Sequence, residues 1–430
     1  MRVLVTGAYG LIGTAVMARL NAAGHALTGA GRSVAAARRR FPYAAWVVAD
    51  FNRLTTEEAW LPLLAGMDAV VNCAGALQSG GRDDLERVHA SAPLALFAAC
   101  RRAGVSRVIQ VSALGAARDG PTEFATTKAE ADAWLAASDL DWLVLRPGVV
   151  LATGVYGGSA MLRGLAGVPW RSPLAAADLA VQVVSADDVA ETVAWALGHG
   201  AKVRGVFELV HPDRHAVGHL VAEQRRWLGF APQPVWNLPR PIPALVAAFA
   251  DALGVLGWRS PARTTALAQL AAMPAGDPAA WIAATGIRPK SLADILAAHP
   301  STVQDRWFAR LYFLKPVAIA SLSALFLVTG LVTLGPGWQE GMAALARLPV
   351  GGAAAVLVAG AVLDIVLGAA LLVHRLVRPA LLTMLALTPL YLLVATFLDT
   401  GLWADPFGRL LKTVPVLALM VITLAILDER

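Results

Sequence analysis

Three glycines near the amino terminus form the pattern in this chain that points most directly to chemistry. Gly7, Gly10 and Gly13 follow the apolar run 3–5 and lead into a helical stretch over 14–23. In such a unit the first glycine permits a tight turn, the second lets the main chain approach a pyrophosphate, and the third lets helix and strand pack closely. Amide groups at the helix start then face the phosphates. The alternative is an ordinary strand-to-helix turn. We expect a dinucleotide-binding turn made of Thr6, Gly7, Tyr9, Gly10, Leu11, Ile12 and Gly13.

The segment after the second expected strand bears on which dinucleotide binds. In many dinucleotide folds a carboxylate at this place binds the ribose 2′-hydroxyl. Here segment 29–33 provides the guanidinium of Arg32 and the hydroxyl of Ser33 instead. Because a guanidinium suits a phosphate, we expect NADP, bound as NADPH, in preference to NAD, with NAD still possible. The alternative is that Arg32 points to solvent.

These residues need a sheet to bring them together. Strand-like runs alternate with alanine-rich amphipathic stretches, and they are expected at 2–6, 25–30, 45–49, 69–72, 107–111 and 142–145. The alternation predicts an α/β fold with a doubly wound parallel sheet, the Rossmann arrangement. We place the NAD(P)-binding core at 1–148 and the rest of the soluble domain, with a small substrate-side subdomain, at 149–305.

The carboxyl-terminal part of the chain has a different composition. The whole chain of 430 residues is 57% hydrophobic and 15% charged, and charges become sparse from about residue 311. Four apolar stretches, each near the ~20 residues that cross a bilayer, are expected at 311–334, 350–373, 380–398 and 410–427. They predict an all-α four-helix transmembrane bundle over 306–430.

Basic residues flank these stretches unequally. One side has Arg306, Arg310, Lys315, Arg375 and Arg378, and the other has Arg347, Arg409 and Lys412. The bias predicts a multi-pass protein of the inner or plasma membrane with both chain ends and the soluble domain in the cytoplasm. The amino terminus has only a three-residue apolar run before Thr6, which is far short of a signal peptide.

The charge and the cysteines exclude some classes of function. The net charge is +6, but the arginines are dispersed and no nucleic-acid motif is present, so we expect no nucleic acid as partner. Only Cys73 and Cys100 occur, which makes a disulfide framework improbable. We expect no metal.

Further segments recur in an order typical of one superfamily. They are Asp50, Asn72-Cys73-Ala74-Gly75, Val111-Ser112, Leu145-Arg146-Pro147-Gly148, and the later segments 184–190 and 285–289. With the glycine turn, residues 1–300 resemble the extended or atypical short-chain dehydrogenases/reductases, including the Rossmann accessory subunit of respiratory complex I and NAD-dependent epimerase/dehydratase-like proteins. The resemblance implies that Asp50 lies at the adenine, that Asn72, Ala74 and Gly75 line the cofactor, and that Pro147 lies near the nicotinamide. A strand-end cap is the alternative for Asp50.

The catalytic Tyr-x-x-x-Lys of that superfamily falls on Phe124 and Lys128. The resemblance implies that Lys128 binds the nicotinamide ribose and that Ser112 hydrogen-bonds a substrate. Phe124 has no proton to donate, and loss of a general acid costs ~10²–10⁴ in rate. Either Tyr156 reaches the site from a loop, or the acceptor takes its proton from water, as a quinone does.

The four apolar stretches resemble the DoxX-like membrane family, which implies a compact helical bundle associated with redox proteins. Asp364 lies within the second stretch, either paired with a neighbouring helix or part of a proton or quinone pocket. The apolar segment 242–256 is expected to pack in a core rather than to lie on a membrane surface.

Two functions follow as hypotheses. The first is a membrane-anchored oxidoreductase that passes reducing equivalents to a small or quinone-like acceptor, in contact with membrane lipid and with a membrane redox partner. The second is a non-catalytic NADPH-binding sensor or scaffold of a membrane complex. A transporter with a regulatory head has only Asp364 in its favour.

Overall fold

The computed structural model describes residues 1–80, 83–105, 107–198, 204–239, 241–346, 348–406 and 408–427. Arg347, which entered the charge comparison above, lies outside these residues. The chain divides into two compact units. The first consists of Met1–Gly254 and Arg259–Ala309, and the second of Val255–Trp258 and Arg310–Arg430.

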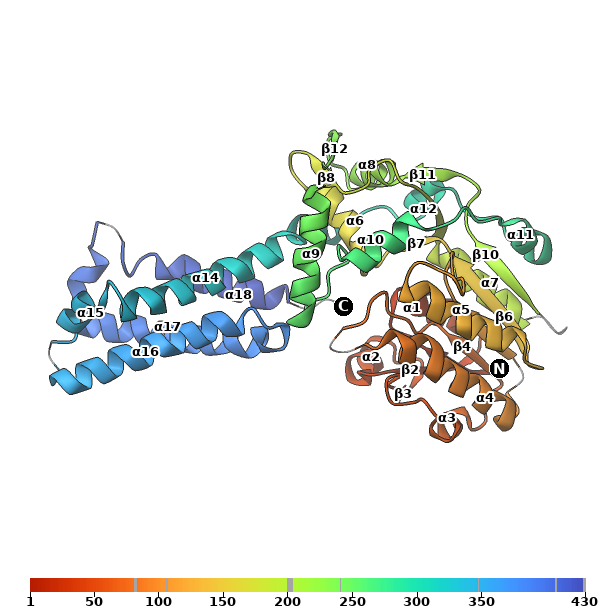
Figure 1. The fold of residues 1–430 in the computed structure, drawn as a ribbon, viewed down its shortest axis with the longest axis horizontal. Coiled ribbons are helices and arrows are strands. Elements are labelled where there is room, and N and C mark those ends of the chain that lie inside the picture. Colours follow the sequence, from red (N-terminus) through yellow and green to blue (C-terminus); the bar gives the residue numbers. More distant parts are fainter. Residues whose placement is uncertain are drawn as a thin grey trace. The chain divides into compact units, whose positions relative to one another are not determined.

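The first unit is built on a seven-stranded sheet in which all pairings are parallel (Figure 1). The strands are, in spatial order, β10 (Gly205–Leu209), β6 (Asp141–Pro147), β5 (Arg107–Val111), β4 (Ala69–Asn72), β1 (Arg2–Thr6), β2 (Ala26–Gly31) and β3 (Ala45–Val48). The chain runs outward from β1 through β3, and then from β4 in the other direction. The predicted doubly wound Rossmann sheet is therefore confirmed, and its switch point lies between β1 and β4, where such sheets bind ligands.

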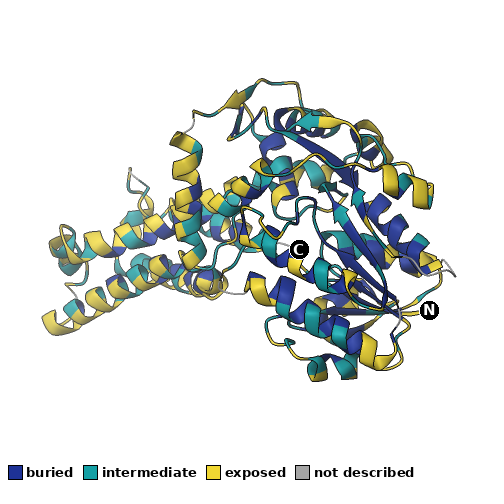
Figure 2. Ribbon diagram, turned by 45° about the vertical axis from the view of Figure 1, so that its right-hand side comes forward, coloured by how far each residue is buried: buried dark blue, intermediate teal, exposed yellow. Residues whose placement is uncertain are grey.

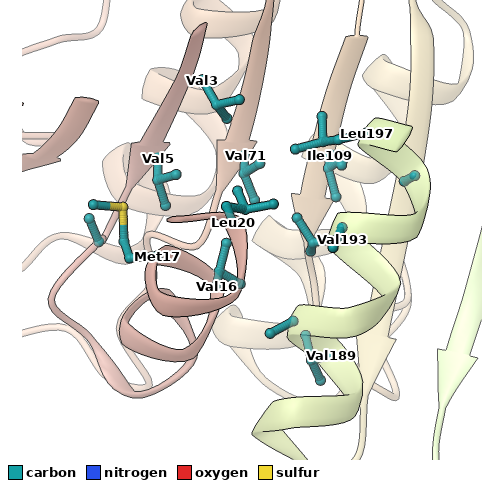
Figure 3. Close-up of a cluster of buried hydrophobic side chains, with 14 of the residues drawn as sticks. Val3, Val5, Val16, Met17, Leu20, Val71, Ile109, Val189, Val193 and Leu197 are labelled. Atoms are coloured by element: carbon teal, nitrogen blue, oxygen red, sulfur yellow. The ribbon is translucent and has the colours of Figure 1, made fainter. Parts of the chain in front are cut away.

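Alternating side chains of the strands supply two separate cores. Val3, Val5, Val71 and Ile109 face one side, where they pack against the helices α1 (Leu11–Ala22) and α7 (Ala186–Gly198) (Figure 3). The residues between them face the other side, against α3 (Glu57–Leu64), α4 (Ala92–Ala103) and α5 (Glu123–Ala136). The period of two follows from the pleat of the strand, and burial on both faces explains why the strands are apolar throughout. Figure 2 shows these strands as buried along most of their length.

Three further helical segments belong to the sheet region of the first unit. α2 (Val34–Arg40) follows β2, and the short π-helical turn η1 (Arg87–Ser91) precedes α4. α11 (Ala279–Thr285) places Trp281, which is fully buried, in the core beneath α7, and the Trp281 Nε1 donates to Thr192 Oγ1 at 2.9 Å.

A smaller group of elements follows β6 and forms a third core. Three strands make one small sheet, in the order β11 (Arg214–Ala216), β9 (Ala180–Ser185) and β7 (Val149–Leu151). β8 (Ser172–Leu174) pairs with β12 (Val235–Asn237). The helices of this part are α6 (Gly158–Gly167), α8 (Val217–Trp227), α9 (Pro241–Val255), α10 (Thr264–Ala271), α12 (Leu292–Ala298) and α13 (Val303–Leu311). The sequence predicted substrate-side elements in this part of the chain. The domain boundary at residue 148 remains a prediction.

The second unit is helical. Its elements are α14 (Leu314–Leu334), α15 (Trp338–Ala344), α16 (Val350–Ala370), η2 (His374–Leu376), α17 (Val377–Leu398), η3 (Thr400–Trp403) and α18 (Thr413–Ala425). Among the described residues, three helical stretches are long and apolar enough to cross a membrane: Leu314–Leu334, Val350–Ala370 and His374–Leu398. Large apolar side chains such as Val317, Leu331 and Phe397 are exposed on their outer surfaces, as lipid-facing side chains are.

Small residues let the first two of these helices approach closely. A Cβ on Gly330 would lie 2.5 Å from the Ala361 carbonyl oxygen, and Ser323 Oγ donates to the Gly368 carbonyl oxygen at 2.7 Å. These contacts pair the end of α14 with the middle of α16, and the middle of α14 with the end of α16, so the two helices are antiparallel. The beginning of α14 and the end of α16 therefore lie at the same end of the bundle.

The fourth predicted span forms a shorter helix than expected. α18 covers 13 residues, and at 1.5 Å per residue it extends about 20 Å, less than the ~30 Å of a hydrocarbon core. The helix starts late because Gly408, with φ of 62°, turns the chain, and residues 409–412 continue that turn.

Candidate functional site

The glycine turn joins β1 to α1 at the switch point of the sheet. Gly7 has φ of 61°, and a Cβ there would lie 2.6 Å from the carbonyl oxygen of Cys73, which follows β4. A Cβ on Gly13 would overlap the main chain of Gly7, so this glycine permits the close packing of helix and turn. A Cβ on Gly10 would meet only the Gly7 oxygen, at 3.1 Å. The amide of Thr14 donates to the Gly10 carbonyl oxygen at 3.0 Å, so the amides of Leu11 to Gly13 precede the first hydrogen bond of the helix. Helix starts of this kind bind the phosphates of dinucleotides.

A chain of buried side chains ties three strand ends together next to the turn. Thr6 Oγ1 donates to Asn72 Oδ1 at 2.5 Å, and Asn72 Nδ2 donates to Gln110 Oε1 at 2.7 Å. The amide of Ala74 also donates to Asn72 Oδ1, at 3.2 Å. Thr6 and Asn72 are fully buried. They therefore position the loop after β4 through hydrogen bonds, and Gln110 is a third member that the sequence did not indicate.

Arg32 lies in an ion-pair cluster at the end of β2. Its Nη1 is 2.6 Å from Asp83 Oδ1, and Nη2 of Arg259 is 2.5 Å from the other oxygen of the same carboxylate. Asp83 is 8% exposed, whereas each arginine side chain is 40% exposed. Two guanidinium groups therefore flank one buried carboxylate, and the cluster carries a net charge of about +1. Neither Asp83 nor Arg259 was indicated by the sequence.

Tyr9 and Asp50 shape the same side of the site. Tyr9 Oη accepts a hydrogen bond from the amide of Ser33 at 3.2 Å, and a Cβ on Gly31 would overlap the Tyr9 ring. Asp50 Oδ1 accepts from the amide of Asn52 at 3.1 Å and from its side-chain amide at 3.2 Å. Asp50 and Asn52 thus form a local turn after β3, and both the strand-end cap and the place of Asp50 at an adenine stay predictions.

His89, which the sequence did not indicate, fixes the loop that follows β4. The amide of Ala76 donates to His89 Nε2 at 3.1 Å. His89 Nδ1 lies 3.2 Å from Thr127 Oγ1, which itself donates to the Glu123 carbonyl oxygen at 2.6 Å. This pattern assigns the neutral tautomer with its proton on Nδ1. Burial, aided by the nearby charge of Lys128, lowers the pKa of His89 well below its ordinary value, so His89 is no proton donor near neutral pH.

Phe124, Lys128 and Asp132 share one face of α5, four residues apart. Lys128 Nζ donates to the Val111 carbonyl oxygen at 3.0 Å and lies 5.8 Å from the centre of the Phe124 ring. Burial lowers the pKa of Lys128 to about 8, although the Asp132 carboxylate acts in the opposite direction. The Phe124 ring packs edge-to-face on His89 with centroids 5.3 Å apart.

Ser112 is buried and directed toward α5. Its hydroxyl donates to Asp132 Oδ2 at 2.8 Å, and the same oxygen accepts from Nε and Nη2 of Arg146 at 3.0 and 2.9 Å. Burial raises the pKa of Asp132, while Arg146 and Ser112 lower it. Because its proton is already donated, Ser112 can offer a ligand only an acceptor in this arrangement.

The remaining predicted residues lie at nearby strand ends. A Cβ on Gly75 would be 3.4 Å from His89 Nε2 and 3.6 Å from Lys128 Nζ, so the structure brings this loop and Lys128 together. Pro147 ends β6, and its carbonyl oxygen accepts from the amide of Leu114 at 3.0 Å. Tyr156 precedes α6, where its amide donates to Ser159 Oγ at 3.0 Å, and its place in the site stays a prediction.

Comparison with known proteins agrees with this geometry. Residues 7–199 match the NAD(P)H-binding family, and residues 323–421 match the DoxX-like family. No match was found among curated proteins.

Solved structures share the fold of the first unit. One is the crystal structure of gox2253, which is 19% identical with a TM-score of 0.54 over 72% of this chain and 98% of that one. A second is MoeE5 in complex with UDP-glucuronic acid and NAD, 18% identical with a TM-score of 0.52 over 72% and 99% of the two chains. A third is the UDP-glucose 4-epimerase of Thermus thermophilus in complex with NAD, 20% identical with a TM-score of 0.51 over 69% and 97%.

The glycine turn at the switch point, the parallel sheet and the three long apolar helices are thus found together with matches to two families, in the order that the sequence predicted. The chain joins an NAD(P)H-binding domain with a Rossmann fold to a carboxyl-terminal DoxX-like domain.

Proposed function

We propose that the first unit binds NADPH and supplies reducing equivalents to a small or quinone-like acceptor that takes its proton from solvent. The observation that carries this proposal is the set of side chains on one face of α5. A phenylalanine, Phe124, stands where the resemblance implies a tyrosine, and neutral His89 beside it holds its proton in a bond to Thr127. Lys128 carries protons at neutral pH, but we assign its ammonium to the nicotinamide ribose, so it does not replace the missing phenol.

The cluster at the end of β2 supports NADPH over NADH. Arg32 and Arg259 place two half-exposed guanidinium groups at one carboxylate, and guanidinium groups bind phosphates with charge-assisted hydrogen bonds. We assign the 2′-phosphate of NADPH to these two arginines. Asp83 orients both of them and keeps the net charge near +1.

Bound NADPH would supply two electrons and one proton to the acceptor as a hydride. The glycine turn would hold its pyrophosphate, and Lys128 would hold its nicotinamide ribose. With a pKa of about 8, Lys128 is mostly protonated at neutral pH and can donate hydrogen bonds to ribose hydroxyls. The reduced acceptor would receive its second proton from water.

The DoxX-like domain favours a lipid-soluble acceptor, because one chain then contains both the coenzyme site and helices that can cross a membrane. The basic residues at 306–315 and 375–378 favour a cytoplasmic location for the first unit, on the side where NADPH is made available. A membrane redox partner and contact with lipid belong to the same proposal.

The test uses the full chain in lipid nanodiscs. Dissociation constants of NADPH and NADH are measured by nicotinamide fluorescence, and coenzyme oxidation is followed with a short-chain quinone and with a panel of aldehydes. Tight NADPH binding and turnover with the quinone but not with aldehydes support the proposal. Robust reduction of aldehydes by the wild-type protein would overturn it.

A non-catalytic NADPH sensor or scaffold is the second candidate. It is favoured by the finding that Ser112 and Lys128 both direct hydrogen bonds to protein atoms, Asp132 and the Val111 carbonyl. Tight binding of NADPH without turnover of any acceptor in the same assay would support this function instead.

A further inference from the structure

Helix α9 (Pro241–Val255) exposes the side chains that a helix normally buries. Ile242, Leu245, Val246 and Phe249 are spaced by three and four residues and therefore form one stripe. Their exposed fractions are 38, 70, 47 and 66%. The sequence favoured a core-packing helix here, but the large apolar side chains are on the outer side, as the exposed colouring of α9 also indicates (Figure 2).

The opposite side of α9 packs on the first unit through small and polar residues. Ala247 and Ala250 are buried. Asp251 accepts hydrogen bonds from Arg263 Nε and Thr264 Oγ1, both at 2.7 Å. Gly254 also faces Arg263, since a Cβ there would lie 3.2 Å from the guanidinium carbon.

These contacts hold α9 in one rotational orientation. Arg263 donates a further hydrogen bond to the Ser79 carbonyl oxygen at 3.0 Å, which fixes it to the body of the unit. Rotation of α9 to bury the stripe would carry Asp251 away from Arg263 and leave both charges without these bonds. The contacts of Asp251 and Arg263 therefore determine that the stripe faces outward.

The short segment at the carboxyl end of α9 belongs to the membrane domain, before the chain returns to the first unit at Arg259. Residues Val255–Trp258 are part of the second unit. The Leu256 carbonyl oxygen accepts from the amide of His374 at 3.1 Å, and Trp258 Nε1 donates to the Leu372 carbonyl oxygen at 2.7 Å. These partners lie between α16 and α17, at the end of the bundle where α14 begins. The carboxyl end of α9 is thus covalently held at one boundary of the membrane-spanning helices.

The connection from the first unit to α14, formed by α13, also exposes large apolar side chains. α13 ends at Leu311, just before α14, and exposes Trp307 and Phe308 at 61 and 36%. Its Ala309 is buried against Gly167 of the first unit. Aromatic side chains beside a span are typical of the membrane–water interface. Both places where the chain passes into the membrane domain therefore carry exposed apolar or aromatic side chains.

We propose that α9 is an interfacial helix whose stripe, Ile242, Leu245, Val246 and Phe249, inserts into the lipid at the bilayer surface on the side where α14 begins. The occupant is lipid rather than a protein because the stripe is continuous along the chain with the membrane domain, whose own outer surface is apolar. The helix would hold the NAD(P)H-binding domain against the bilayer.

The experiment places single cysteines on the full chain in nanodiscs and labels them with an environment-sensitive fluorophore. Phe249→Cys and Leu245→Cys lie on the stripe, and Ala244→Cys, exposed on the other side of α9, is the matched control. The parent protein, with Cys73 and Cys100, gives the background. NADPH binding by each variant shows that the first unit is folded.

At Phe249→Cys and Leu245→Cys we expect a blue shift of emission and a loss of emission when the nanodiscs contain doxyl-labelled lipid, with neither change at Ala244→Cys. Equal quenching at all three positions, or none at the stripe, would overturn the proposal. A blue shift without quenching by doxyl lipid would also overturn it, because the stripe would then be covered by protein, either this chain's own bundle or a second copy.

Discussion

Replacement of Arg259 by alanine is predicted to weaken NADPH binding about tenfold and to leave NADH binding unchanged. Arg259 is remote in sequence from the glycine turn, and its ion pair with Asp83 places it beside Arg32. A charge-assisted hydrogen bond contributes about 1.5–3 kcal/mol, and the 40% exposure of the side chain favours the lower limit. About 1.4 kcal/mol corresponds to a factor of ten in the dissociation constant.

The shared carboxylate makes the effects of the two arginines non-additive. Removal of either one leaves the other neutralised by Asp83, so the local charge falls from about +1 to about 0. We therefore expect Arg32→Ala to cost about as much as Arg259→Ala. The double variant should cost more than the product, because it leaves the buried Asp83 carboxylate unpaired, with a local charge of about −1 facing the phosphate. Adding Asp83→Asn to Arg259→Ala removes the competing charge and should recover much of the NADPH affinity.

The dissociation constants of NADPH and NADH for each variant are measured by titration, with nicotinamide fluorescence as the signal. Arg53→Ala is the matched control, because Arg53 is 88% exposed and its nearest carboxylate, Asp50, is 3.9 Å away. An equal loss of NADPH and NADH affinity in Arg259→Ala, or an unchanged ratio of the two, would refute the assignment of the 2′-phosphate. Absence of rescue by Asp83→Asn would refute the charge argument.

Three further predictions concern the rest of the site. Phe124→Tyr is expected to add aldehyde reduction and to leave quinone reduction unchanged, and an assay in which the wild type already reduces aldehydes as well as the variant contradicts the loss of a general acid. Gly7→Ala should abolish coenzyme binding because φ is 61° and the new Cβ would lie 2.6 Å from the Cys73 carbonyl oxygen, whereas Gly24→Ala, with φ of 79° and nothing within 4 Å, should lose only about 1 kcal/mol of stability and still bind. The folded-state pKa of Lys128 is about 8 and its ordinary value is 10.5, so between these pH values the unfolded chain binds more protons than the folded chain. The free energy of unfolding should therefore rise with pH in this window, by up to about 3 kcal/mol, and Lys128→Met should remove that rise. An unchanged slope of thermal stability against pH in the variant would contradict the burial of a charged amine.

Local patterns were sufficient for the fold of the first unit. The apolar runs bury both faces of each strand, and their alternation with amphipathic helices leaves a parallel sheet as the arrangement that satisfies every run. The positive φ of Gly7 and the close packing at Gly13 were likewise anticipated, because only glycine meets those steric demands. The prediction of the helical bundle was less accurate. Composition indicates which stretches are apolar, but it does not indicate that the chain turns near Gly408 and that α18 is therefore shorter.

The sequence by itself determined the Rossmann sheet, the glycine turn, the presence of Arg32 and Phe124 at two informative positions, and the long apolar helices of the carboxyl-terminal domain, because each depends on residues close together in the chain. Tertiary structure decided the rest. It alone places Asp83 between Arg32 and Arg259, brings His89 against Phe124, and turns the apolar stripe of α9 outward. The physical reason is that ion pairs and burial depend on which distant segments meet, and hydrophobic periodicity indicates that a helix has an apolar face but not which way that face points.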